Sequence, residues 1–187
     1  GKRMNTKRDQ IITTTCQLIE TQGYHATGLN QILAESGAPK GSLYYYFPDG
    51  KDGLVEEAIA RTSQLIAERL QEGMAAYDSP AEAIPNFLRS LAHHVQASGF
   101  ESGGPITAVA LEAASTNERL NAACRAAYQA WQKVIEQKLL ASGYEPVRAR
   151  RLGTLVIAII EGATILSRSE RNVGPLLDAA LELEALL

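Results

Sequence analysis

The sequence predicts an all-α protein, made of a small N-terminal helical domain and a larger C-terminal helical domain. Apolar residues recur at helical spacing through most of the 187 residues. Short clusters that contain Gly, Pro or Ser separate these periodic segments, as expected of turns between helices. The chain is long enough for a small domain fused to a larger one. We place the boundary at residue 50, so that the two domains comprise residues 1–50 and 51–187.

The first helix is expected over residues 7–22. Thr6 and Asp9 have the spacing of a capping pair, in which the side chains satisfy free backbone N–H groups at the helix start. Ile12, Cys16 and Ile19 then form an apolar stripe, which predicts packing against the next helices. Gly23 ends the helix.

Residues 27–47 predict two short helices that meet at a tight corner. We expect Thr27 to cap the first of them, because a Thr side chain can accept a bond from a free backbone N–H group. Apolar residues at helical spacing follow it: Leu29, Ile32 and Leu33. Gly37 suits the left-handed conformation that often ends a helix, and Pro39 suits the first turn of a new one.

The second short helix has an apolar side and a polar side. Leu43 and Phe47 lie four residues apart and can face a core. The remaining side chains are left at or near the surface: Lys40, Ser42, Tyr44, Tyr45 and Tyr46. Two helices joined by a Gly-containing turn, the second rich in donors, is the arrangement that lays a recognition helix in a DNA major groove. An ordinary αα-corner is the alternative interpretation.

The segment GAPKGSLYYYFPDGKDGLVEEAI, residues 37–59, resembles the signature of the TetR family of bacterial transcriptional repressors. The spacing of its Gly, Lys, aromatic and Leu positions carries this resemblance. The stretch GGPITAVALEAAS, residues 103–115, resembles the branch that includes repressors of multidrug-resistance and flavonoid-responsive genes. Two positions depart from the family pattern, because Pro39 stands where a Ser is common and Tyr46 where a His is frequent. Operator preference therefore does not carry over.

The resemblance implies a palindromic double-stranded DNA operator and a set of residues that contact it. The implied contacts are Thr27, Lys40, Gly41, Ser42, Tyr44, Tyr45, Tyr46 and Lys51. We assign the two Lys and Thr27 to phosphates, and Ser42, Tyr44 and Tyr45 to base edges or sugars. Lys51 opens the next helix, where a phosphate could meet both its charge and free N–H groups.

The second domain is expected to hold six helices and, by the resemblance, an effector pocket. The helices are predicted over about residues 51–77, 80–96, 106–113, 116–142, 147–168 and 175–187. Side chains from three of them would suit a small, flat, aromatic or apolar effector: Phe87, Leu91, Tyr128, Trp131, Glu161 and Thr164. The alternative for most of the Tyr128 and Trp131 stripe is plain core packing.

The two C-terminal helices are apolar on too many sides for a monomer. LGTLVIAIIEGATILS, residues 152–167, is apolar almost all round, and residues 175–187 carry more Leu than one helix face can hold. A helix that is apolar all round must be covered all round. These helices therefore predict an isologous homodimer with a four-helix interface.

Composition limits the remaining function classes. The formal net charge is −3, with +2 on residues 1–48 and −5 on the rest, which suits a DNA-reading module on an acidic body. Cys16 and Cys124 have no partner at metal-ligand spacing, so we expect free thiols, no metal and no cofactor. No apolar run approaches the ~18 residues of a membrane span, and we expect a cytoplasmic protein without membrane contact.

Two other function classes remain as alternatives to a ligand-responsive regulator. A helical adaptor would use the same corner to bind protein instead of DNA. An all-α enzyme would use Glu161 with His93 or His94 as base. We expect no enzymatic activity, because no set of nucleophile, base and orienting residue is apparent.

Overall fold

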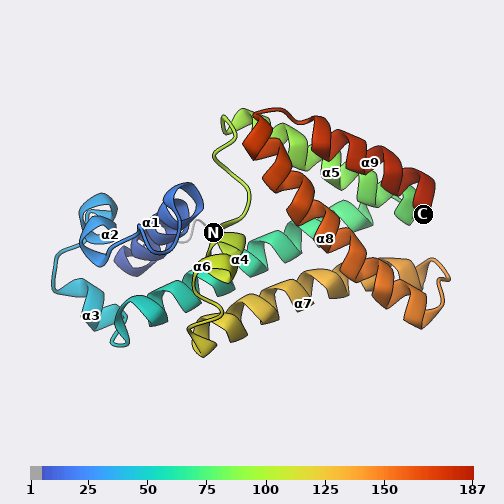
Figure 1. Cartoon of the computed structure of the whole chain (residues 1–187). Helices are drawn as coiled ribbons and strands as arrows, with labels where there is room; N and C mark the ends of the chain where they lie inside the picture. The colour runs from blue at the N-terminus through green and yellow to red at the C-terminus, as the bar shows by residue number, and fades with distance from the viewer. Residues whose placement is uncertain (1–5) are drawn as a thin grey trace. The chain divides into compact units, whose positions relative to one another are not determined.

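The computed structural model describes residues 6–187, and within that range it contains nine helices and no strand (Figure 1). This confirms the predicted all-α class. The helices are α1 (Lys7–Gln22), α2 (Leu29–Ser36), α3 (Ser42–Tyr46), α4 (Gly50–Ala75), α5 (Pro80–Ala97), α6 (Pro105–Glu112), α7 (Glu118–Ala141), α8 (Pro146–Glu170) and α9 (Gly174–Leu186).

The chain forms two compact units. The first unit combines the residues up to Thr62 with Pro105–Ala127, and the second combines Ser63–Gly104 with Tyr128–Leu187. Helices α4 and α7 each contribute residues to both units. The division predicted at residue 50 does not coincide with these packing units; as a division by function it stays a prediction.

The first unit is built around a small apolar core under α1, α2 and α3. Its buried residues are Ile11, Ile12, Leu18, Ile32, Leu43, Phe47, Leu54 and Ala58. Helix α1 starts with the predicted capping box: Asp9 N donates to Thr6 Oγ1 at 3.2 Å, and Thr6 N donates to Asp9 Oδ2 at 3.3 Å. Gly23 ends the helix with φ 88°.

The predicted cap at Thr27 is wrong. The residue before α2 is Gly28, and no side chain caps the helix. Thr27 is fully buried, and its hydroxyl donates to Gly23 O at 2.7 Å. The hydroxyl therefore ties the α1–α2 loop back to the end of α1 instead of holding the first turn of α2.

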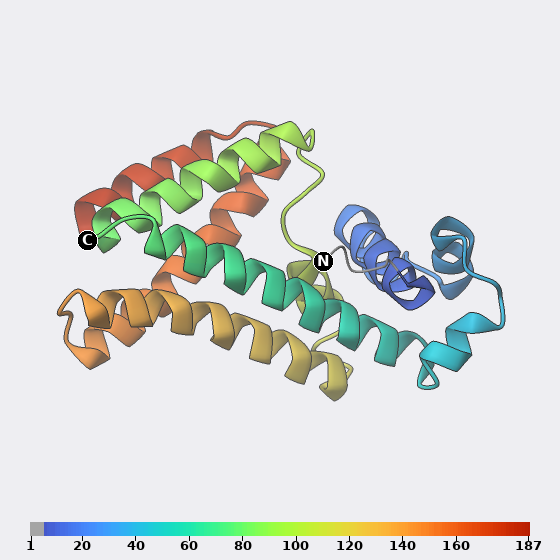
Figure 2. The ribbon, with the colours of Figure 1, turned by 180° about the vertical axis from the view of Figure 1, so that it is seen from behind.

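The second unit is dominated by α5, α8 and α9. Helices α5 and α9 lie antiparallel side by side in both views (Figures 1 and 2). Arg89 of α5 pairs with Glu184 of α9 at 2.7 Å, and one cluster buries Ala92, Val95, Ala163 and Leu176 between the three helices. Helix α5 begins with Ser79 as cap and Pro80 in the first turn.

Helices α8 and α9 expose large apolar side chains: Leu155, Ile165, Leu166, Leu177, Leu181 and Leu186. Among the helices of residues 6–187, α8 is also the one long and apolar enough to span a membrane, with a mean hydropathy of 1.4 in its most apolar window. The expectation that no apolar run approaches that length was therefore wrong. Of this segment, 39% is buried within the protein. The core helix of a soluble protein can have the same length and hydropathy, so these two properties are weak evidence for a membrane span.

Candidate nucleic-acid interface and effector-binding residues

The corner between α2 and α3 is set by two backbone features. Gly37 ends α2 in the left-handed conformation, at φ 65° and ψ 22°. Residues 39–41 then form a turn in which Ser42 N donates to Pro39 O at 2.9 Å. Helix α3 consequently begins at Ser42, later than the expected start at Pro39. Leu43 and Phe47 anchor it, because both are buried in the core of the first unit as predicted.

Helix α3 presents two tyrosines to solvent. Tyr44 is 64% exposed and Tyr45 is 80% exposed. Tyr46 is half-buried and packs against the core, and its ring meets that of Tyr45 edge to face with centroids 5.0 Å apart. Lys40 and Gly41 are exposed in the turn before the helix. The corner thus exposes donors and aromatic faces on a helix whose opposite side is fixed in the core.

Lys51 lies at the start of α4 against Tyr24. Its Nζ donates to Tyr24 O at 2.8 Å and lies 4.0 Å from the centroid of the Tyr24 ring. Burial lowers the pKa of Lys51, an effect that the carboxylates of Asp52 and Glu112 oppose. Tyr24 in turn donates its hydroxyl to Asp52 Oδ1 at 3.3 Å. The Lys51 ammonium group is therefore held in one place against Tyr24.

Three of the predicted effector residues lie together in the second unit. The Tyr128 hydroxyl donates to Glu161 Oε2 at 3.0 Å, which joins α7 to α8. The rings of Tyr128 and Trp131 meet edge to face, with centroids 5.3 Å apart. Trp131 is buried, and its Nε1 donates to Ser63 O at 3.1 Å. This group combines two aromatic rings with one carboxylate.

The other predicted effector residues have packing or backbone partners. Phe87 lies half-buried against Gly73. Leu91 packs against the cluster between α5, α8 and α9. Thr164 is buried and donates its hydroxyl to Ile160 O at 2.7 Å. Their roles toward a ligand stay predictions.

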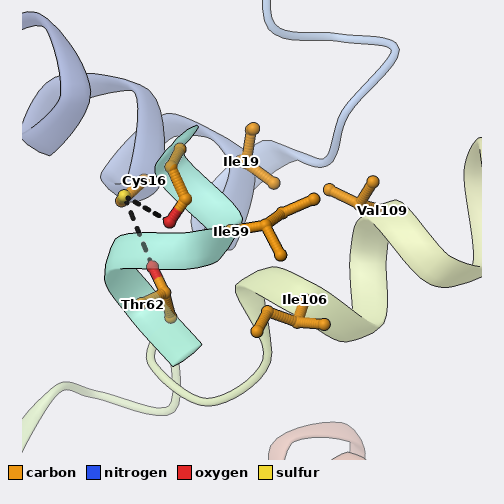
Figure 3. Close-up of a pocket in the computed structure, with 7 residues that line it drawn as sticks. Cys16, Ile19, Ile59, Thr62, Ile106 and Val109 are labelled. Carbon is orange, nitrogen blue, oxygen red and sulfur yellow. Dashed lines mark hydrogen bonds between the residues drawn. The ribbon is translucent and has the colours of Figure 1, made fainter. Parts of the chain in front are cut away.

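A small cavity in the first unit was not apparent from the sequence. Its volume is about 10 Å³, and it lies between α1, α4 and α6 (Figure 3). Cys16 and Thr62 form its polar side, where Thr62 Oγ1 donates to Cys16 Sγ at 3.4 Å. Burial raises the pKa of the Cys16 thiol. A cavity of this size holds one water molecule at most, so it is no effector site.

Polar contacts at the start of α4 were also not apparent from the sequence. Asp52 accepts from Asn117 Nδ2 at 2.9 Å, and Arg119 pairs with both Asp49 and Glu56. Periodicity cannot reveal such contacts, since they join residues more than 60 positions apart. Within residues 6–187, no group of three His, Cys, Asp or Glu side chains could hold a metal ion.

Helix α2, the Gly37 turn and the exposed α3 define a protein of the helix-turn-helix class. Comparison with known proteins places it more narrowly. Residues 11–58 match the family of bacterial regulatory proteins called tetR, and residues 80–182 match the C-terminal domain of LmrA/YxaF-like transcriptional regulators. The chain belongs to the TetR family of transcriptional regulators.

Individual relatives agree over nearly the whole length. The chain is 41% identical to the HTH-type transcriptional regulator LmrA of Bacillus subtilis over 170 residues, covering 91% of this chain and 90% of LmrA. It is 38% identical over 180 residues to the uncharacterized HTH-type transcriptional regulator YxaF of the same organism, covering 96% of this chain and 94% of YxaF. The fold of a TetR regulator from Legionella pneumophila superposes with a TM-score of 0.87 at 18% identity, over 99% of each chain.

Proposed function

We propose that this regulator is a cytoplasmic repressor that binds a palindromic operator as a homodimer and is released by a small aromatic or apolar effector. The observation that carries the proposal is the exposure of Tyr44 and Tyr45 on a helix anchored by Leu43 and Phe47. Exposed aromatic donors on a helix that is already anchored can enter a major groove with little further loss of backbone conformational entropy.

The proposed contacts with DNA involve the side chains on and around α3. Tyr44, Tyr45 and Ser42 reach base edges or sugars from α3, while Lys40 and Lys51 meet phosphates. Gly41 and Tyr46 complete the surface at the edges of the helix. The sequence assigned Thr27 to a phosphate, but its side chain is fully buried, so its hydroxyl holds the loop before α2 instead of contacting DNA.

Dimerisation is supported by the exposed apolar residues of α8 and α9. One short helix reads few base pairs, so specificity requires two recognition helices about 34–36 Å apart in successive major grooves. An isologous dimer supplies that spacing and makes the operator a palindrome. The apolar side chains that α8 and α9 leave in solvent would be covered in such a dimer.

Release by an effector is supported by the group formed by Tyr128, Trp131 and Glu161. Two aromatic rings and one carboxylate suit a flat molecule that carries a hydrogen-bond donor. Phe87, Leu91 and Thr164 would extend the apolar lining. An effector weakens operator binding only if it binds the non-operator conformation more tightly, and a coupling of about 1–3 kcal/mol lowers operator affinity roughly 5–150-fold.

Selection of operators from random duplexes tests this proposal. The full-length protein should enrich one palindrome, and Tyr45→Ala should bind it much more weakly. Tyr77→Ala serves as the matched control, because Tyr77 is an exposed tyrosine between α4 and α5. Enrichment of no duplex would refute the proposal and favour the helical adaptor. Equal binding by Tyr45→Ala would remove Tyr45 from the interface.

A further inference from the structure

The corner between α6 and α7 contacts the two segments that flank the helix-turn-helix, namely the loop after α1 and the start of α4. All the residues involved belong to the first compact unit. The corner supplies Glu112 at the end of α6, Asn117 in the connection and Arg119 in the first turn of α7. No local signal in residues 1–50 requires this corner, since it lies far along the sequence.

On one side, Glu112 holds the loop after α1. Its Oε2 accepts from His25 N at 2.8 Å, and its backbone O lies 3.1 Å from His25 Nε2. Gly23 borders the same carboxylate so closely that a Cβ there would overlap Glu112 Oε1. The glycine that ends α1 therefore also makes room for Glu112.

On the other side, Arg119 and Asn117 hold the start of α4. Arg119 Nη1 pairs with Asp49 at 2.9 Å, and its Nε pairs with Glu56 at 2.6 Å. A Cβ on Gly53, within the same turns of α4, would lie 3.5 Å from Arg119 Nη2 and 3.0 Å from Asp49 Cβ. Glycine inside a helix is unfavourable by roughly 1 kcal/mol relative to Ala. Here it leaves room for the ion pairs.

Asn117 extends this contact to Lys51. Asn117 Nδ2 donates to Asp52 Oδ2 at 2.9 Å, and Asp52 Oδ1 accepts from the Tyr24 hydroxyl at 3.3 Å. The Lys51 ammonium group lies over the ring of Tyr24 in a cation–π contact. Asn117 and Lys51 are thus connected through Asp52 and Tyr24.

We infer that Glu112, Asn117 and Arg119 are positioning residues for operator binding. They fix the α1–α2 loop and the start of α4, the two segments between which α2 and α3 are held. The operator-binding unit is therefore discontinuous in sequence and includes the α6–α7 corner. This inference rests on the proposed operator binding, and it assigns no DNA contact to the corner itself.

The test uses the full-length protein and the palindrome that the wild type selects. Asn117→Ala/Arg119→Ala should bind the operator about fivefold or more weakly, the low end of typical coupling between sites. The dependence of log K on log salt concentration should keep its slope, because no phosphate contact is lost. Arg119→Lys should recover part of the affinity, since a Lys can still pair with one carboxylate. Arg125→Ala is the control, because Arg125 forms an exposed ion pair with Glu118 within α7.

A second readout needs no DNA. Amide hydrogen exchange in residues 24–27 and 50–56 should be faster in the double variant, while exchange in α9 stays unchanged. Should the double variant fail to unfold cooperatively, Asn117→Ala and Glu112→Gln are measured against the same criteria.

Wild-type operator affinity in a folded double variant would overturn the inference. So would a salt slope that falls by about 0.9, which would show that Arg119 contacts a phosphate directly. Unchanged exchange in both segments would overturn it as well. A wild type that enriches no duplex would instead refute the proposed function, and the exchange measurement would still test the positioning.

Discussion

Leu181 offers the sharpest test of the proposed dimer, because it is the most exposed of the large apolar residues on α8 and α9. It is 60% exposed in the single chain. In an isologous interface built from these two helices, the side chain would be buried once in each protomer. Replacing Leu181 with Ala removes that burial, and replacing it with Arg also places two like charges in one apolar interface.

The size of the effect follows from the exposed fraction. Complete burial of a Leu side chain is worth about 1.5–3 kcal/mol, so the exposed 60% corresponds to about 1–2 kcal/mol per protomer. Two copies give about 2–4 kcal/mol per dimer, which is roughly a 30-fold to several-hundred-fold increase in the dimer dissociation constant. Leu181→Arg should exceed this range, because an unpaired charge would be buried in each half.

Sedimentation velocity over a range of protein concentrations measures that constant. We expect a dimeric wild type at micromolar concentration, a weakened dimer for Leu181→Ala and a monomer for Leu181→Arg. Glu182→Ala is the matched control, because Glu182 is the exposed neighbour on the same helix. A monomeric wild type, or a Leu181→Arg protein that dimerises as tightly as the wild type, would refute the reasoning.

Three further predictions concern stability and DNA binding. Leu43→Ala should lower the free energy of unfolding by about 2–5 kcal/mol in urea melts, because it leaves a cavity under α3; a loss well below 1 kcal/mol would contradict the buried anchor. Lys51→Ala should reduce the salt slope of operator binding by about 0.9, and an unchanged slope would show that Lys51 binds no phosphate. Glu145 caps α8 by accepting two backbone N–H bonds, and these bonds lower its pKa. Its contribution to the free energy of unfolding is therefore present above its unfolded pKa and is lost as the pH falls through the folded pKa. Glu145→Gln should therefore melt below the wild type at pH 7. The difference should start to shrink as the pH falls below the unfolded pKa of about 4.3 and should be lost below the folded pKa, and a difference that persists in stronger acid would exclude the carboxylate as its cause.

Helices with strong local signals could be predicted from the sequence. The Thr6 and Asp9 pair located the start of α1. Thr27 could not be assigned correctly, because a Thr before a helix can cap it or can donate to an earlier carbonyl. In the structure, Gly23 O at the end of α1 lies within reach of the Thr27 hydroxyl, so Thr27 donates to this carbonyl instead of capping α2.

In the candidate site, too, the features set by local sequence were predictable and the long-range contacts were not. The exposed α3 and its buried anchors follow from local spacing, so Leu43, Phe47 and the exposed tyrosines were identified correctly as core and surface. The position of Lys51 on the Tyr24 ring was not predictable, because it depends on a loop 27 residues earlier in the chain. The contacts of Arg119 depend on still longer separations.

Trp131 is the single tryptophan of the chain. It is buried, its indole N–H is held by Ser63 O, and the Tyr128 ring lies against it. Its intrinsic fluorescence therefore comes from one defined environment, next to a tyrosine whose hydroxyl donates to the Glu161 carboxylate. A compound that entered this environment would change the intensity or wavelength of that emission, so chemical libraries can be screened on the unlabelled protein before the operator is known.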